Sequence, residues 1–330
     1  MLAFKVIPVP FLVGVLGIFF GLCYKGIDRK LAARMQSRVG PPLRQPFIDV
    51  KKLLLKQNVV PEKSVPWLFN LMPMVGLASA ITILLYLPVG DLPPVLSGYG
   101  DMILVLYLLT IPALAMVLGG LASGAPYAIV GAQREMVMMI SYEVPLATAV
   151  VAIAWRLQAM LPAGAEVFSM GVIFSNPLWT QVGPVGFIGL LILFLVSMVV
   201  IPIELSKIPF DIAEAETEIA GGLLSEYSGR NLSLFYLMDA VKTVAMASLV
   251  IALFFPYQIG YSLGLSGWGG GIVNVIFFLL KVFVLILCSV TIVRVAAARL
   301  KIDQATFFYW VPIAFASLAG LGLLSLDKFM

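Results

Sequence analysis

Long apolar runs separated by short polar stretches dominate this chain. Eight runs approach the roughly 20 residues that a helix needs to cross the hydrocarbon core of a bilayer. They predict membrane-spanning helices near 3–24, 66–88, 102–122, 136–155, 183–203, 235–256, 271–296 and 305–325. No alternating strand pattern repeats, which argues against a β-barrel. We therefore predict an all-α membrane protein in which residues 1–330 form a single multi-pass membrane domain.

Two shorter helices are predicted outside the bilayer. In segment 43–57, Phe47, Val50 and Leu54 fall on one helical face, so this segment should be an amphipathic helix on the cytoplasmic membrane surface. This helix could anchor the chain to the lipid surface or dock a partner. Asp211 and Glu214 have the spacing of a capping box, which predicts a short acidic loop helix running to about Ile219.

The distribution of charge predicts the orientation of the chain. Hydrophobic residues make up 61% of it and charged residues only 12%, about half the charge of an ordinary soluble domain. The basic residues gather beside the predicted loops 25–65, 123–135, 204–234 and 297–304; the exceptions are Lys5, Arg156, Lys281 and Lys328. Positive loops face the cytoplasm. We expect a protein of a prokaryotic cytoplasmic membrane with these loops inside and both termini outside.

Several kinds of chemistry have no residues to carry them. The chain has no histidine, and its two cysteines, Cys23 and Cys288, cannot ligate an iron–sulfur cluster. No metal-binding, nucleotide-binding or nucleophile motif is present, and nothing points to a nucleic-acid partner. We expect no metal site and no catalytic residue in this chain, so any redox cofactor should lie in a partner subunit.

Acidic residues are concentrated in one segment. Six of the chain's 17 acidic residues lie between Glu204 and Glu226, and only Lys207 and Arg230 offset them. Carboxylates beside a bilayer are costly, which points to proton or cation handling. Alternatives remain for some of them, because Glu204 could pair with Lys207 and the capping box could account for two others. The candidate residues for proton transfer in this segment are Glu204, Asp211, Glu214, Glu216, Glu218 and Glu226.

One further acid lies inside a predicted span. Glu143 costs about 2.5–3.5 kcal/mol at the centre of a bilayer on insertion scales. Tyr142 precedes it and could join a proton relay. The alternative is a packing carboxyl paired with Arg134 or Lys242.

Within the acidic segment, Glu214 and Glu218 are spaced i,i+4, so repulsion on a shared helix would favour protonation of one of them.

A basic cluster follows the first predicted span. Lys30, Arg34 and Arg38 recur at i,i+4 spacing and would share one face of a helix that ends at 40–42, Gly-Pro-Pro. This cluster fits either contact with anionic lipid or docking of a soluble partner.

Three blocks together resemble a known family. They are DRKLAARMQSRVGPPLRQPFIDVKKLLLK (28–56), GAPYAIVGAQREMVMMISYEVPL (124–146) and ELSKIPFDIAEAETEIAGGLLSEYSG (204–229). The chain resembles the membrane-embedded H subunit of respiratory complex I and its homologues in energy-converting, group 4 NiFe hydrogenases and related ferredoxin-linked complexes. The resemblance covers essentially the whole chain.

The resemblance implies a membrane anchor and proton-transfer subunit without a cofactor of its own. The NiFe centre and iron–sulfur clusters would lie in peripheral large and small subunits fed by ferredoxin, with antiporter-like subunits beside it in the membrane. It also implies an interface with the peripheral arm at Asp28, Arg29, Lys30, Arg34, Arg38 and Arg134. The contracted stretch 40–46 and the blocks 124–127 and 226–229 favour the hydrogenase branch. The alternatives are a quinone-binding subunit of a complex I and a subunit of a sulfur-reducing complex.

Overall fold

The computed structural model describes residues 8–96, 98–162, 166–260, 264 and 267–328. These residues form helices and loops, and the described part contains no β-strand, only an isolated bridge between Val89 and Leu92. Eight of its helical segments are long and apolar enough to cross a membrane. The predicted all-α membrane fold is confirmed.

Six of the eight segments are single helices, and two contain a π-helical turn. The single helices are α2 (Pro8–Met35), α4 (Pro66–Tyr86), α5 (Met102–Ala122), α6 (Pro126–Met160), α8 (Pro184–Glu204) and α10 (Gly229–Phe254). The seventh joins α11 (Trp268–Ile286), η3 (Leu287–Thr291) and α12 (Ile292–Ala296). The eighth joins α13 (Ile302–Phe308), η4 (Tyr309–Ile313) and α14 (Ala314–Leu326).

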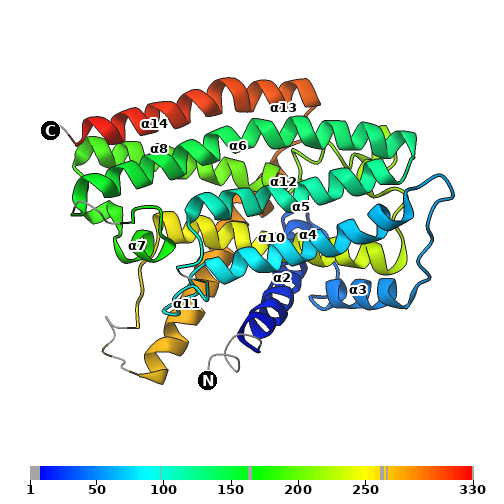
Figure 1. Ribbon diagram of the computed structural model, residues 1–330, viewed down its shortest axis with the longest axis horizontal. Coiled ribbons are helices and arrows are strands. Elements are labelled where there is room, and N and C mark those ends of the chain that lie inside the picture. The colour runs from blue at the N-terminus through cyan, green and yellow to red at the C-terminus, as the bar shows by residue number, and fades with distance from the viewer. Residues whose placement is uncertain (1–7, 97, 163–165, 261–263, 265–266, 329–330) are drawn as a thin grey trace.

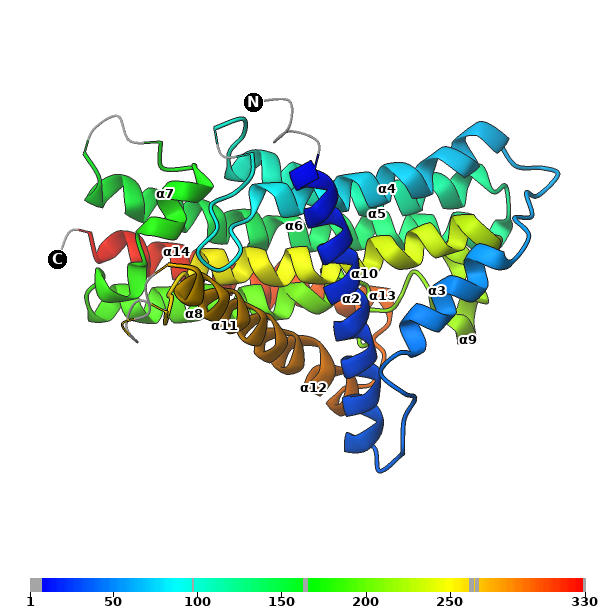
Figure 2. The ribbon, with the colours of Figure 1, turned by 90° about the horizontal axis from the view of Figure 1, so that it is seen from below.

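The long helices are not all parallel. α4, α5, α6, α8, α10 and the α13–α14 segment run along the long axis of the molecule, whereas α2 and α11 cross them obliquely (Figures 1 and 2). α10 is the central helix, because 89% of its most apolar window is buried inside the protein. It packs against α2, α4, α8 and α11. Helices that face lipid elsewhere therefore enclose one helix that is almost wholly protected from it.

Several predicted spans extend further than their apolar runs. α2 continues through the basic residues to Met35, and its predicted first residues lie outside the described part of the chain. α6 begins at Pro126, the favoured first position of a helix, so most of the expected loop 123–135 is helical. Apolar composition marks the part of a helix in the bilayer, but a helix continues until a breaker residue or cap ends it.

The predicted surface helix is present as α3 (Gln45–Leu55). Val50 is buried against Leu22 of α2 and Ala240 of α10, and Phe47 packs beside it. Leu54, in contrast, is exposed. One side of α3 is thus fastened to the protein rather than lying free on lipid.

The predicted acidic loop helix is shorter than expected, and its capping box is wrong. α9 covers only Glu216–Ile219, its N-cap residue is Ala215, and it ends at Ala220 in the left-handed conformation. Asp211 pairs with Arg299 instead of capping a helix. Glu214 and Glu218 therefore do not share a helix. Two further short elements lie between α6 and α8, α7 (Met170–Ser175) and the 3₁₀ turn η1 (Leu178–Thr180), and they were not predicted.

A buried ion pair joins the end of α6 to the end of α14. Arg156, near the end of α6, lies 2.7 Å from Asp327, which follows α14. The same carboxylate accepts hydrogen bonds from the backbone N–H groups of Gly183 and Gly186 at the start of α8. One side chain therefore ties the ends of three long helices together.

Candidate functional site

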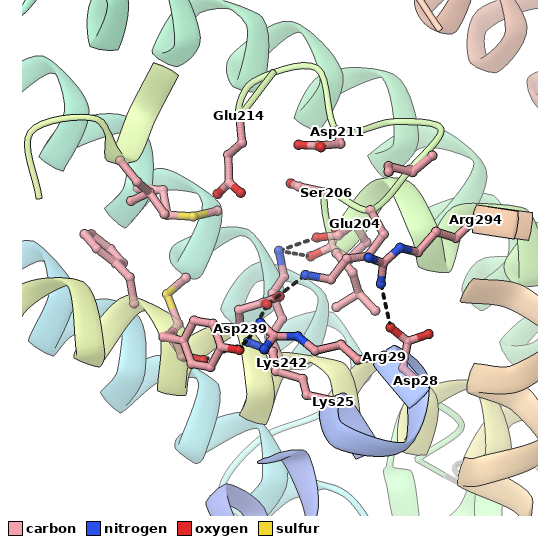
Figure 3. A pocket seen from close by; sticks show the side chains of 18 of the residues that line it. Lys25, Asp28, Arg29, Glu204, Ser206, Asp211, Glu214, Asp239, Lys242 and Arg294 are labelled. Atoms are coloured by element: carbon pink, nitrogen blue, oxygen red, sulfur yellow. Dashed lines mark hydrogen bonds and ion pairs between the residues drawn. The ribbon is translucent and has the colours of Figure 1, made fainter. Parts of the chain in front are cut away.

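A charged cavity of about 270 Å³ lies where α2, α8, α10 and α12 meet the loop that follows α8 (Figure 3). Charged side chains of both signs line it in equal numbers. The basic ones are Lys25, Arg29, Lys207, Lys242 and Arg294, and the acidic ones are Asp28, Glu204, Asp211, Glu214 and Asp239. The cavity is thus far more polar than the chain as a whole.

Helical spacing and one irregular loop bring these side chains together. Asp239 and Lys242 are spaced i,i+3 on α10 and so share a face. α8 ends at Glu204, and Ser206, in the left-handed conformation, turns the chain over the cavity. The loop then runs without regular structure to α9, which leaves its side chains free to point inward. Gly229 lets α10 begin close to the chain after α3, because a Cβ there would lie 2.5 Å from the Gln57 carbonyl oxygen.

Glu204 and Lys242 form the deepest ion pair of the cavity. The lysine Nζ lies 2.8 Å from the Glu204 carboxylate and also donates to the Glu204 main-chain oxygen at 2.6 Å. Their side chains are only 1% and 2% exposed. Since removing one partner of a buried pair typically costs about 3–5 kcal/mol, this contact fixes the end of α8 on α10. The sequence alternative in which Glu204 pairs with Lys207 is not formed.

Asp239 forms ion pairs with two lysines. Lys25 of α2 lies 2.6 Å from its carboxylate and Lys207 of the loop lies 2.8 Å from it. Lys25 also donates to the Tyr236 main-chain oxygen and lies over the Tyr236 ring. Burial lowers the pKa of Lys207, but the adjacent Asp239 outweighs burial and holds that pKa above its ordinary value. Lys207 is therefore a full positive charge at neutral pH.

The loop acids differ in their partners. Figure 3 shows the Glu214 carboxylate pointing from the loop into the cavity, and no ion pair or hydrogen bond reaches it within the described residues. Burial raises the pKa of Glu214 to about 7, with Lys207 opposing this shift and Asp239 adding to it. Burial also raises the pKa of Asp211, which Arg299 at 2.7 Å opposes. Glu214 can therefore gain or lose a proton near neutral pH.

α6 adds a buried acid and a tyrosine to this region. Glu135 is 3% exposed, and the Ser206 hydroxyl lies 3.4 Å and 3.5 Å from its two carboxylate oxygens. Tyr142 lies two helical turns further along α6 and is buried. Its hydroxyl lies near Glu204 but forms no hydrogen bond with any described residue. Glu143 is partly buried. It pairs with neither residue of the packing alternative, because Lys242 is held by Glu204 and Arg134 by Glu218.

The remaining predicted acids lie on the surface. Glu216 and Glu226 are exposed, and Glu218 pairs with Arg134 at 2.6 Å. Arg134 also donates to the Ile212 main-chain oxygen. The structure therefore places Arg134 beside the acidic loop.

Of the residues predicted to face the peripheral arm from this region, Asp28, Arg29 and Arg38 line cavities, whereas Lys30 and Arg34 line neither of the two. Asp28 and Arg29 line the charged cavity, where Asp28 pairs with Arg294 at 2.9 Å and Arg29 reaches Asp49 of α3 at 2.9 Å. Arg29 and Arg294 also line a second cavity of about 440 Å³ together with Arg38. Lys30 and Arg34 lie on the last turns of α2, but Arg38 is beyond the end of that helix.

Six charged residues of this site were not predicted as site residues: Lys25, Glu135, Lys207, Asp239, Lys242 and Arg294. Lys207 and Lys242 were considered only as possible ion-pair partners of Glu204 and Glu143. Asp239 and Lys242 lie within the predicted span 235–256, and charged residues inside a span are a functional signal in their own right. Glu135 was assigned to a loop that proved to be helix. Only the tertiary structure could show that Lys25, near the start of the chain, meets Asp239.

The arrangement can hold and pass charge. Carboxylates and lysines of α2, α8 and α10 line the cavity, and Glu135 of α6 contacts the Ser206 hydroxyl beside it. The described residues include no group of three or more Cys, Asp or Glu placed to hold a metal ion.

These features define a multi-pass α-helical membrane protein with a buried acid–lysine site. The sequence profile described as NADH dehydrogenase matches residues 7–325, so the chain belongs to this family. It is 35% identical over 298 residues to Hydrogenase-4 component C of Escherichia coli (strain K12), covering 90% of this chain and 89% of that protein. It is 32% identical over 314 residues to the H subunit of NADH-quinone oxidoreductase of Bacillus cereus (strain B4264), covering 91% and 87%.

A solved structure shares the whole fold. A chain of the membrane-bound sulfane sulfur reductase, an archaeal respiratory membrane complex, superposes with a TM-score of 0.81 at 28% identity, covering 96% of this chain and 98% of that one. The family that the three sequence blocks resemble is confirmed, and its members named here are components of multisubunit redox systems.

Proposed function

We propose that this chain is the membrane anchor and proton-transfer subunit of an energy-converting hydrogenase complex. In this complex, oxidation of ferredoxin and evolution of hydrogen would drive translocation of protons or sodium ions. The NiFe centre and the iron–sulfur clusters would lie in peripheral large and small subunits, and antiporter-like subunits would adjoin the chain in the membrane. The chain itself would contribute charge relays and no cofactor.

The observation that carries the proposal is the buried acid–lysine site inside an apolar protein. Glu135, Glu204 and Lys242 are each no more than 3% exposed, and Glu204 and Lys242 line the same cavity as Glu214. Such groups are costly in a membrane and mark ion or proton pathways. Electron transfer in the arm would change the charge beside the cavity and so shift the protonation of these acids.

The hydrogenase assignment rests on the relatives and on the cavity. Hydrogenase-4 component C matches nine-tenths of the chain at 35% identity. Small-molecule pockets are usually lined by apolar and aromatic groups, whereas ten charged side chains line this cavity. This favours a charge-handling vestibule over the quinone site of the alternative assignment. The fold similarity to a sulfane sulfur reductase chain supports a sulfur-reducing complex as the second candidate.

The orientation follows from the same proposal. The basic ends of α2 and α12 and the loop 205–228 would face the cytoplasm and the peripheral arm, with Asp28, Arg29, Lys30, Arg34 and Arg38 at or near the contact. Both termini would lie outside.

The test is to replace Glu135 by Gln in the intact complex. The amide keeps the shape of the side chain but cannot accept a proton, so ions translocated per electron should fall roughly tenfold or more. Electron transfer from ferredoxin should persist. Ion uptake by vesicles and hydrogen evolution, measured together, report both quantities. Glu143→Gln should act in the same direction if the relay continues along α6.

Glu62→Gln is the matched control, because Glu62 is an exposed acid that does not line the cavity. Equal ion-to-electron ratios in Glu135→Gln and wild type would reject the proton-transfer role. Production of sulfide from polysulfide, without hydrogen evolution, would favour the second candidate.

A further inference from the structure

The charges around the cavity are paired unevenly. Each lining acid except Glu214 has an ion pair within the described residues, and Asp239 has two. Glu214 shares the cavity with Lys207 but pairs with no described residue. Asp239 thus has one more cation than it needs and Glu214 has none, although both acids line the same cavity.

We propose that Lys207 is a mobile counter-ion that bridges to Asp239 while Glu214 is protonated and moves to the Glu214 carboxylate when Glu214 ionises. This inference rests on the proposed function, in which the loop acids exchange protons. It assigns Lys207 a positioning role: it would convert the protonation of Glu214 into a change in the contact between the loop and α10.

Asp239 does not need both lysines. Lys25 lies 2.6 Å from the carboxylate and is held in place from α2 by the Tyr236 main-chain oxygen and ring. When Lys207 leaves, Asp239 therefore keeps one short ion pair and is not left as an uncompensated buried charge. Lys25 has no comparable freedom, since three contacts fix its ammonium group.

Lys207 has the freedom that the exchange requires. It lies in the irregular loop just after Ser206, its side chain is 28% exposed, and Asp239 is its one ion-pair partner among the described residues. A lysine ammonium is a compact charge on a flexible four-carbon stem with three rotatable donors. Glu214 is seven residues further along the same loop and faces the same cavity. Lys207 and Glu214 therefore lie on one irregular loop and line one cavity, with no long helix between them in the chain.

The other charges that face Glu214 leave Lys207 as its natural partner. Asp211, Glu135 and Asp239 are acids and repel the ionised form, whereas Lys207 opposes the rise in its pKa. Lys242 is held by Glu204, and Arg294 by Asp28.

A structure of the intact complex at two pH values tests the exchange directly. At about pH 5.5 we expect the Lys207 side chain on Asp239, and at about pH 8.5 on Glu214, because these values lie on either side of a pKa of about 7. In Glu214→Gln, Lys207 should stay on Asp239 at both values. A Lys207 that remains on Asp239 at high pH in the wild type would overturn the proposal.

An infrared titration without turnover supplies a second measurement. The band of protonated Glu214 is identified by its loss in Glu214→Gln. Lys207→Gln should raise the midpoint of this band by about one pH unit or more, because ionised Glu214 loses its partner. Lys207→Arg keeps the charge and is the matched control, with a midpoint near that of the wild type. An unchanged midpoint in Lys207→Gln would also overturn the proposal.

Neither measurement depends on ion translocation. If Glu135→Gln translocates ions normally but Lys207 moves with pH, the proposed function fails and the exchange stands. If Lys207 does not move but Glu135→Gln blocks translocation, the exchange alone fails.

Discussion

At the scale of single residues, the Glu204–Lys242 pair is the clearest departure from an ordinary membrane interior. Both side chains are fully buried between α8 and α10. A buried ion pair rarely stabilises a protein more than apolar side chains of similar volume would. Stability alone therefore gives little reason for this pair, which is consistent with a role in moving charge.

Glu214 gives a prediction about pH. Its pKa is about 7 in the folded protein against an ordinary value of 4.5, so between these values the folded state holds a proton that the unfolded chain releases. The stability contribution of Glu214 therefore falls as pH rises from about 4.5 to about 7. Glu214→Gln should remove this loss and stabilise the protein at pH 8 by on the order of 2 kcal/mol.

Thermal unfolding of the purified complex at several pH values measures this effect. The gain in Glu214→Gln should shrink toward zero near pH 4.5. Asp49→Asn is a useful comparison, because Asp49 does not line the cavity and pairs with Arg29, so its loss should not stabilise the protein at pH 8. A Glu214→Gln variant less stable than wild type at pH 8 would contradict the assignment.

At the scale of elements, the close approach of α2 to α10 sets one wall of the cavity. A Cβ on Gly21 would lie 2.3 Å from the Ala240 main-chain oxygen, and that oxygen belongs to the residue next to Asp239. The helix backbones can therefore meet at Gly21 only without a side chain. Lys25, one turn further along α2, reaches Asp239 because of this contact.

Gly21→Ala should push the two helices apart. Overpacking of this kind typically costs about 1–3 kcal/mol, and the displacement should loosen the Lys25–Asp239 pair. Gly322→Ala is the control, since Gly322 is also helical but has open space where a Cβ would lie. Thermal unfolding should show a loss for Gly21→Ala and little change for Gly322→Ala. Equal midpoints for the two variants would refute the close contact.

The predicted elements show what sequence patterns can and cannot supply. The apolar run 102–122 coincides with α5, because Asp101 caps the start of this helix and Ser123 and Gly124 follow its end. α6 was predicted too short, since polar residues such as Arg134 and Glu135 resemble a loop when their burial is unknown. The capping box at Asp211 failed because Arg299, distant in sequence, competes for that carboxylate.

The candidate site was predictable only in part, for the same reason. Local enrichment of acids revealed the loop that contains Glu214. The charges that face this loop across the cavity, such as Lys25 on α2 and Asp239 on α10, come from other elements, and helix packing alone brings them together. Pairing partners such as Lys25 and Asp239 are set by tertiary structure, so no local pattern identifies them.

At the scale of the whole molecule, the two ends of the helix bundle are built differently. The end with the cavity holds many charges, one of them without a partner, around an irregular loop. The opposite end is held by one carboxylate, Asp327, which pairs with Arg156 and accepts hydrogen bonds from two backbone N–H groups at the start of α8, while the buried Arg156 Nε has no partner among the described residues. If the helices are held at the Asp327 end, a change of charge at the cavity end would displace the helices relative to one another there. Without the fixed end, whole helices would shift together.

Asp327→Asn tests this fixed end. The amide would leave Arg156 as a buried, unpaired cation, which typically costs about 3–5 kcal/mol, and it would weaken the cap on α8. We expect a lower unfolding temperature and faster proteolytic cleavage at the C-terminal end, as α14 separates from α6 and α8. Lys328→Ala is the matched control at the neighbouring position, where the side chain only lies over the Trp155 ring. If the fixed end is needed for coupling, the surviving Asp327→Asn complex should also translocate fewer ions per electron than Lys328→Ala, although both retain every acid of the cavity. Equal ratios in the two variants would mean that the cavity works independently of this end of the bundle.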